Sequence, residues 1–232
     1  MTMNHKRLGA ALAAGFAVQF AAPVAAQEGA GIVGQNDWLY YLYDITNESE
    51  QPSIAKSIGL FAALSDVLAA NDTRMVLAVV PAKVRVYPEN LPPERAPTPF
   101  LIEHYRKSVQ ALRQGGVDVV DLETPFLAQA RAGDGELLFM RLDSHWSQTG
   151  SLLAAERIAE HAAGNPATKA ALDALPTRAY TLEWNPTPQT LAAGDLTSIL
   201  PAGTPAFEPE QVRVFGVTAP AGGDLLAEDA TP

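Results

Sequence analysis

The chain has no cysteine in its 232 residues. No disulfide can therefore stabilise the fold, and a lipid-anchored exported protein, which needs a cysteine directly after its signal, is excluded. Stability must come from a buried core instead. The length is sufficient for one domain with such a core.

Basic side chains are scarce as well. The sequence holds 16 lysines and arginines against 26 aspartates and glutamates, which gives a formal net charge of −10. A protein that binds nucleic acid needs a basic surface to displace the counterions of the phosphates. We therefore predict no nucleic-acid partner.

The N-terminus has the pattern of an export signal. Lys6 and Arg7 precede an apolar run over residues 8–22, and small residues follow at 24–26. That run is shorter than the ~20 residues of a membrane span. We predict a signal peptide over residues 1–26, cleaved after Ala26, and one domain over residues 27–232. Cleavage would remove two basic and no acidic residues, so the net charge would change from −10 to −12.

The mature chain alternates strand and helix patterns. Apolar residues recur at helical spacing from Ser53, and short β-branched runs follow, bounded by proline or glycine. This alternation predicts an α/β fold with helices on both faces of a parallel sheet. The expected strands cover 74–81, 117–122 and 137–141, and the expected helices cover 53–71, 100–114, 123–133 and 148–163.

Two further segments lie outside this alternation. Residues 31–43 predict two short extended pieces around a Gly-Gln-Asn-Asp turn. The last 68 residues hold half of the chain's 18 prolines. There we expect one strand, over 211–217, in a tail that otherwise wraps the domain as extended loops.

Polar residues follow two of the expected strands. Lys83 comes after the first and "DSHWSQTG" (143–150) after the third, so both loops should open at the ligand-binding edge of the sheet. If the backbone turns there, the Asp143 carboxylate can accept a hydrogen bond from one nitrogen of His145 and leave the other as a base. The same residues also fit two metal ligands, or a polar loop without chemistry.

The serines near this pair have structural explanations. Ser147 stands where a helix N-cap belongs, Ser144 points away between the pair, and Ser151 lies in the first turn of a helix. The metal alternative lacks ligands, because His104 and His161 lie in expected helices without ligand-type neighbours. We expect neither a metal nor another cofactor.

Five ordered motifs resemble one known family. They are "GQNDWLYY" (34–41), "VVPAKVRVYPENLP" (79–92), "GVDVVDL" (116–122), "DSHWSQTGSLLAAERIA" (143–159) and "GDLTSIL" (194–200). Together they resemble the alginate O-acetyltransferases, which are SGNH-hydrolase-like periplasmic proteins. The Asp-x-His-Trp-Ser block is the most specific of the five.

The resemblance implies a flavodoxin-like, three-layer fold with a mainly parallel sheet and a Ser-His-Asp triad. Asp143 would orient His145, and His145 would be the general base that helps to move acetyl groups onto hydroxyls of an exported polysaccharide such as alginate. The acceptor would be acidic, and Lys83, Arg85 and Arg141 would receive its carboxylates while Trp146 lines the sugar site. A membrane acyltransferase would deliver the acetyl groups in the periplasm.

The family's nucleophile is absent from this sequence. It is a serine on a Gly-x-Ser turn after a later strand, and no such turn occurs in residues 165–232, where Ser198 is the only serine. We therefore expect the domain to be incomplete at its C-terminus, and this form to be poorly stable and inactive. The alternatives are a non-catalytic polysaccharide-binding or scaffold protein of an export complex, and a plain SGNH-type esterase.

Overall fold

The computed structural model describes residues 29–133, 136–174 and 180–218; the expected signal peptide at 1–26 lies outside these ranges. The helices are α1 (Gln51–Ala69), α2 (Lys83–Val86), α3 (Pro99–Gln114), α4 (Glu123–Ala132), α5 (Gln148–Gly164) and α6 (Pro166–Asp173). The strands are β1 (Gly31–Val33), β2 (Leu39–Tyr41), β3 (Val76–Val79), β4 (Asp118–Asp121), β5 (Thr181–Trp184), β6 (Gln189–Leu191), β7 (Glu210–Val212) and β8 (Phe215–Thr218).

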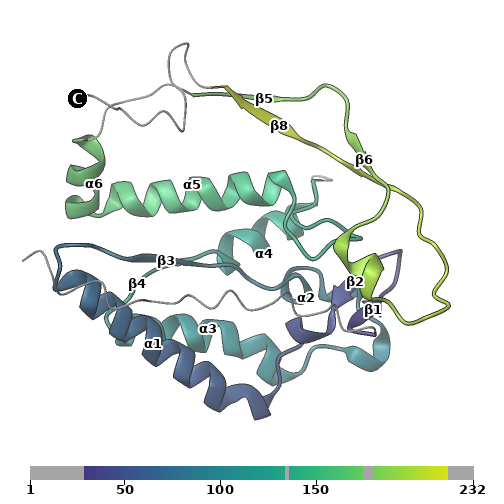
Figure 1. Cartoon of the computed structure of the whole chain (residues 1–232), viewed down its shortest axis with the longest axis horizontal. Coiled ribbons are helices and arrows are strands. Elements are labelled where there is room, and N and C mark those ends of the chain that lie inside the picture. The colour runs from purple at the N-terminus through teal and green to yellow at the C-terminus, as the bar shows by residue number, and fades with distance from the viewer. Residues whose placement is uncertain (1–28, 134–135, 175–179, 219–232) are drawn as a thin grey trace, which may run out of the picture.

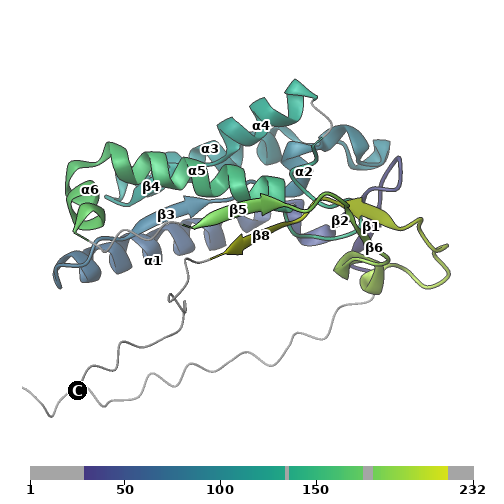
Figure 2. The ribbon, with the colours of Figure 1, turned by 90° about the horizontal axis from the view of Figure 1, so that it is seen from above.

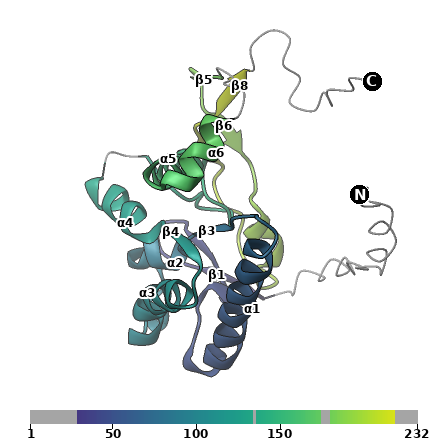
Figure 3. The same cartoon turned by 90° about the vertical axis from the view of Figure 1, so that its left-hand side faces the viewer.

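The centre of the fold is a parallel pair of strands. β3 and β4 run in register from Val76 beside Asp118 to Val79 beside Asp121. Helices α1 and α3 lie on one face of the pair, and α4 and α5 lie on the other (Figures 1 and 3). The described residues thus place helices on both faces of a two-stranded parallel pair, which is smaller than the parallel sheet that the alternating pattern predicts.

Successive residues of β3 and β4 point into different cores. Leu77 and Val119 pack with side chains of α1 and α3, whereas Val76 and Val120 pack with those of α4 and α5. Alternate side chains of a strand point to opposite faces, so both faces are apolar only if both are covered. This explains why β3 is a continuous apolar run and why β4 carries two adjacent valines between its aspartates. Both strands lie within the expected segments 74–81 and 117–122.

The expected third strand at 137–141 does not form. Among the described residues this segment has one isolated antiparallel bridge, between Phe139 and Trp146, and it does not pair with β3 or β4. Leu138 and Leu142 are fully buried. The apolar run thus reports a buried loop rather than a strand, a distinction that hydrophobicity alone cannot make.

The hairpin of β1 and β2 confirms the expected turn at 34–37. Its strands are antiparallel, with Gly31 opposite Tyr41, and Asn36 and Asp37 adopt φ of +54° and +60°. Asparagine and aspartate tolerate this left-handed conformation better than most residues. The hairpin reaches the 137–142 segment directly, since the Leu39 N–H donates to the Arg141 carbonyl at 2.9 Å.

The tail contains more regular structure than its composition predicts. The expected strand at 211–217 is divided into β7, which pairs antiparallel with β6, and β8, which pairs antiparallel with β5. A 3₁₀ helix, Asp195–Ile199, packs near β1 and β2. Figure 2 shows β6 and β7 at the same end of the molecule as this hairpin, with α6 at the opposite end.

Two helices differ in detail from the expectation. α1 has the predicted helical spacing, yet only some of its apolar residues are covered, and Leu60 and Val67 are 63% and 60% exposed. His161 on α5 is not simply solvated, because its Nε2 lies 2.6 Å from Asp118 of β4. This contact ties α5 to the sheet.

Candidate active site

A tight loop carries the Asp-x-His motif. The Ser147 N–H donates to the Leu138 carbonyl at 2.9 Å, and the Met140 N–H donates to the His145 carbonyl at 3.3 Å. The chain thus folds back on itself, with residues 141–145 forming the turn. Ser147 then begins α5, because its hydroxyl accepts the Gly150 N–H at 3.1 Å, which confirms the expected N-cap.

Asp143 and His145 are in direct contact. Oδ1 of Asp143 lies 2.7 Å from Nδ1 of His145 and also accepts the His145 backbone N–H at 2.9 Å. The backbone turn on which this pairing depends is therefore present. The His145 side chain is 70% exposed, whereas that of Asp143 is 14% exposed. Because Nδ1 is engaged, Nε2 is the nitrogen left for chemistry.

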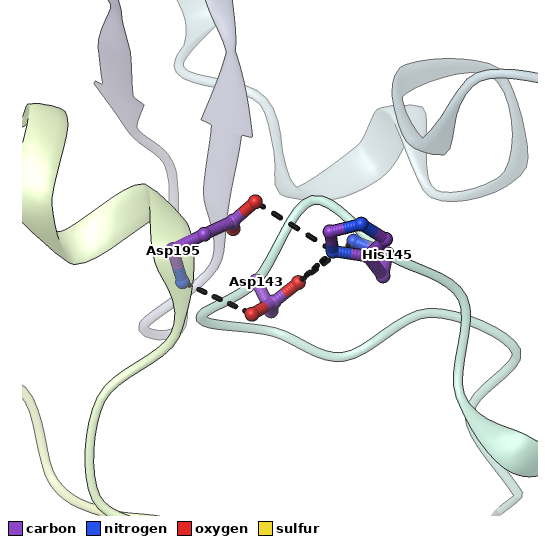
Figure 4. A group of neighbouring side chains, drawn as sticks. All are labelled: Asp143, His145 and Asp195. Atoms are coloured by element: carbon purple, nitrogen blue, oxygen red, sulfur yellow. Dashed lines mark hydrogen bonds and ion pairs between the residues drawn. The ribbon is translucent and has the colours of Figure 1, made fainter. Parts of the chain in front are cut away.

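Asp195 braces this pair from the 3₁₀ helix. Its N–H donates to Oδ2 of Asp143 at 3.0 Å, and its carboxylate accepts the N–H and hydroxyl of Ser144 at 2.7 and 2.5 Å. Figure 4 shows Asp195 and Asp143 facing the same ring nitrogen of His145, and Oδ2 of Asp195 lies 3.6 Å from that nitrogen.

The glycine before Asp195 makes the close approach possible. A Cβ on Gly194 would overlap the carbonyl of Leu142 and lie 2.8 Å from the Cα of Asp143. Sequence reasoning placed both residues in a family motif and assigned neither a role. The glycine-acid pair, some 50 residues after the Asp-x-His motif, was the available signal.

The contacts of Asp143 and His145 shift the pKa values of both side chains in the direction that favours an ion pair between them. The hydrogen bond that the His145 ring donates to Asp143 is the main cause that raises the pKa of His145 above its usual 6.5, helped by the charges of Asp143 and Asp195. Burial would raise the pKa of Asp143, but the N–H groups of Asp195 and His145 and the imidazole outweigh it and hold that pKa below 3.8. His145 is thus a stronger base than free histidine.

Lys83 supports the loop from inside the protein. The residue is 1% exposed, and Nζ donates to the carbonyls of Leu39, Met140, Arg141 and Asp143 at 2.6–3.0 Å. Burial lowers its pKa to about 7, while Glu210, Asp143, Asp44 and Asp195 oppose the shift. A side chain so enclosed cannot reach a polysaccharide, so the expected substrate contact is corrected to a positioning role.

The other three expected substrate residues are also tied into the protein. Arg85 forms an ion pair with Glu123, and its side chain is 7% exposed. Arg141 lies 3.9 Å from the buried Glu210, which also accepts the Arg141 N–H. Trp146 is half-buried against the main core. The structure therefore brings Asp143 and His145 together, but it does not gather Lys83, Arg85 and Arg141 into one basic surface.

The serines near the pair are engaged elsewhere. The hydroxyl of Ser147 donates to the Leu137 carbonyl, that of Ser151 to Gln148, and that of Ser198 to Asp195. Within the described ranges no serine hydroxyl hydrogen-bonds to His145. Among these described residues, His145 is an oriented base to which no serine hydroxyl is hydrogen-bonded.

The three side chains could also be considered as metal ligands. Asp143, His145 and Asp195 each offer one atom, and these atoms lie within 4.8 Å of one another. The 2.7 Å separation of Oδ1 and Nδ1 is a hydrogen-bond distance. The imidazole and the carboxylate are therefore hydrogen-bonded to each other.

Comparisons with known proteins identify the family of the chain. A family model described as "SGNH hydrolase-like domain, acetyltransferase AlgX" matches residues 32–232. A relative from Azotobacter vinelandii, "Probable alginate O-acetylase AlgJ", is 31% identical over 217 residues, which cover 87% of this chain and 52% of the relative. The chain spans about half the length of the curated relatives it matches.

Two solved structures share the fold. The "O-Acetyltransferase Domain of Pseudomonas putida AlgJ" superimposes with a TM-score of 0.68 at 27% identity, covering 83% of this chain and 66% of that one. Pseudomonas aeruginosa AlgX gives a TM-score of 0.61 at 19% identity over 82% of this chain and 44% of that one, a likeness of fold alone. The fold is thus SGNH-hydrolase-like, and the chain belongs to the AlgX family of SGNH-hydrolase-like acetyltransferase domains.

Proposed function

We propose that this chain is the acid–base part of a periplasmic O-acetyltransferase that acts on hydroxyls of an acidic polysaccharide such as alginate. The 2.7 Å contact between Asp143 and Nδ1 of His145 is the observation that carries the proposal. It fixes the tautomer of the ring and leaves Nε2 available to accept a proton from a hydroxyl. The family match supports acetyl transfer as the reaction.

The proposed reaction needs a serine that lies outside the described residues. His145 takes the proton of that serine as its oxygen attacks the acetyl donor, and returns the proton to the leaving group. The acceptor hydroxyl then attacks the acetyl-serine, with His145 as base again. We further propose that a later strand carries this serine and completes a flavodoxin-like, mainly parallel sheet, that residues 1–26 direct export, and that a membrane acyltransferase supplies the acetyl groups.

Replacement of the pair tests this function. In the longest product of the gene, His145→Ala and Asp143→Ala should abolish release of nitrophenol from an acetyl ester and acetylation of an oligouronate. His104→Gln, on α3, is the control that should retain both. Full turnover in the two alanine variants would refute the assignment of the triad.

A second candidate function is a polysaccharide-binding or scaffold protein without catalysis. The engagement of the nearby serine hydroxyls favours it. The two functions separate in one measurement, because a scaffold binds oligouronate and leaves the acetyl ester intact whatever residue stands at 145.

A further inference from the structure

A groove lined by three arginines lies between α3 and α4, and neither Asp143 nor His145 lines it. Three of the 16 basic side chains, Arg106 and Arg113 of α3 and Arg131 of α4, line one groove of about 580 Å³ between the two helices. This volume is in the range of small-molecule and oligosaccharide sites. Three arginines and two carboxylates line it, so the groove has an excess of positive charge in a chain whose formal net charge is −10.

The groove has an apolar floor and a cationic rim. Tyr105 and Val109 are buried beneath it, and Leu127 is half-buried. The Tyr105 hydroxyl is fixed, because it donates to the Val79 carbonyl at 2.6 Å and accepts the N–H groups of Leu122 and Glu123. A sugar ring presents apolar C–H faces and polar edges, and a floor and rim of this kind complement both.

The two carboxylates that also line the groove are already engaged. Glu123 pairs with Arg85, and Asp121 accepts the Glu123 N–H at 2.9 Å and the Thr124 hydroxyl at 2.8 Å. In the described part of the chain, Arg106 and Arg131 form no ion pair within 4 Å. Arg113 donates to the Val119 carbonyl at 3.1 Å with one nitrogen. The guanidinium groups therefore retain donors for a ligand.

The spacing of the arginines suits an extended polyanion. Arg106 and Arg113 are seven residues apart on α3, which places them on one helix face with a rise of about 10 Å between them. Arg131 stands across the groove on α4. Guanidinium groups bind carboxylates through paired N–H donors.

We propose that this α3–α4 groove binds a segment of a carboxylate-bearing polysaccharide, with Arg106, Arg113 and Arg131 receiving its uronate carboxylates. It takes the place of the expected patch of Lys83, Arg85 and Arg141. The polymer's identity rests on the proposed function, but the groove does not depend on the acid–base pair. The groove holds one segment of the acceptor polysaccharide on the protein surface while another segment of the same polysaccharide is acetylated.

Titration of the 232-residue chain with a hexauronate, followed by amide NMR shifts and calorimetry, tests the groove. Arg106→Gln with Arg131→Gln should weaken binding roughly tenfold, and the shifts of α3 and α4 should disappear. Arg95→Gln, which removes one charge outside the groove, is compared with Arg106→Gln alone and should leave the affinity unchanged. A neutral cellohexaose should not bind.

Each outcome decides the proposal. Unchanged affinity in the double variant, equal binding of the neutral hexamer, or the absence of any binding would overturn it. His145→Ala separates it from the proposed function, because that variant should bind the hexauronate normally. If the hexauronate binds in the groove but the longest product of the gene acetylates no oligouronate, the proposed function alone is refuted.

Discussion

At the scale of the residue, the contact between Asp143 and His145 controls the proton affinity of the imidazole. Because the carboxylate raises the pKa of the ring, Asp143→Asn should lower the pKa of His145 toward or below 6.5. Proton NMR of the ring, titrated from pH 4 to 9, measures this directly in the 232-residue chain. Asp37→Asn, in the exposed β1–β2 turn, is the control. An unaltered titration in Asp143→Asn would show that the hydrogen bond does not set the pKa.

The same pair gives the stability of the fold a pH dependence of known sign. The pKa of His145 is raised, so its contribution is complete below 6.5 and is lost as the pH rises through the folded value. The pKa of Asp143 is lowered, so its contribution is present above 3.8 and is lost as the pH falls through the folded value. The difference in unfolding free energy between the wild type and Asp143→Asn should therefore be largest between these limits.

Lys83 is buried in the structure, and the sequence alone does not predict this burial. Lys83→Met keeps the apolar stem but leaves four carbonyls without their shared donor. Burying the ammonium group costs free energy, which offsets part of what its hydrogen bonds contribute. Removing the ammonium group nevertheless leaves the buried carbonyls without a hydrogen-bond donor, which costs more. We expect the free energy of unfolding, measured with urea, to fall by about 2–4 kcal/mol. Lys56→Met, on the exposed side of α1, should change stability by less than about 0.5 kcal/mol.

At the scale of the element, the packing of the 3₁₀ helix against the Asp-x-His loop depends on Gly194. In Gly194→Ala the new methyl group would overlap the Leu142 carbonyl and push Asp195 away from Asp143. We expect the free energy of unfolding to fall by about 2–3 kcal/mol and the pKa of His145 to fall as well. Gly59→Ala, where a Cβ in α1 would meet nothing within 4 Å, should be neutral or stabilising. An unshifted His145 titration in Gly194→Ala would mean that Asp195 does not brace the pair.

Elements with a strong local signal could be predicted from the sequence, and those defined by distant partners could not. The sequence predicts helix α5 with its Ser147 cap, and it predicts β3 and β4 from short runs of β-branched residues whose side chains contribute to two cores. The 137–142 segment is also apolar, but its backbone groups hydrogen-bond to Leu39, Lys83 and Glu210, which lie 57–102 residues away along the chain. Local hydrophobicity contains no record of such partners.

The candidate site divides in the same way. Asp143 and His145 are close in sequence, so their pairing needed only a turn. The brace by Gly194 and Asp195 joins segments about 50 residues apart, and the enclosure of Lys83 joins three segments. These contacts depend on tertiary packing. They show Lys83, an expected substrate residue, donating hydrogen bonds to the loop that carries Asp143.

At the scale of the whole molecule, negative charge dominates, with a formal net charge of −10. The folded chain therefore repels itself, while the α3–α4 groove attracts anions locally. Salt screens both effects, since the Debye length falls to about 10 Å at 0.1 M and about 3 Å at 1 M.

Raising sodium chloride from about 20 to 500 mM should therefore have opposite effects on two properties of the same chain. The midpoint of thermal unfolding should rise by roughly 2–5 °C as self-repulsion is screened, whereas the affinity for a hexauronate should fall as the arginines are screened. Calorimetry measures both. A midpoint that falls with salt would show that attractive pairs such as Arg85–Glu123 outweigh the repulsion, and an affinity independent of salt would mean that the ligand is held by contacts other than charge.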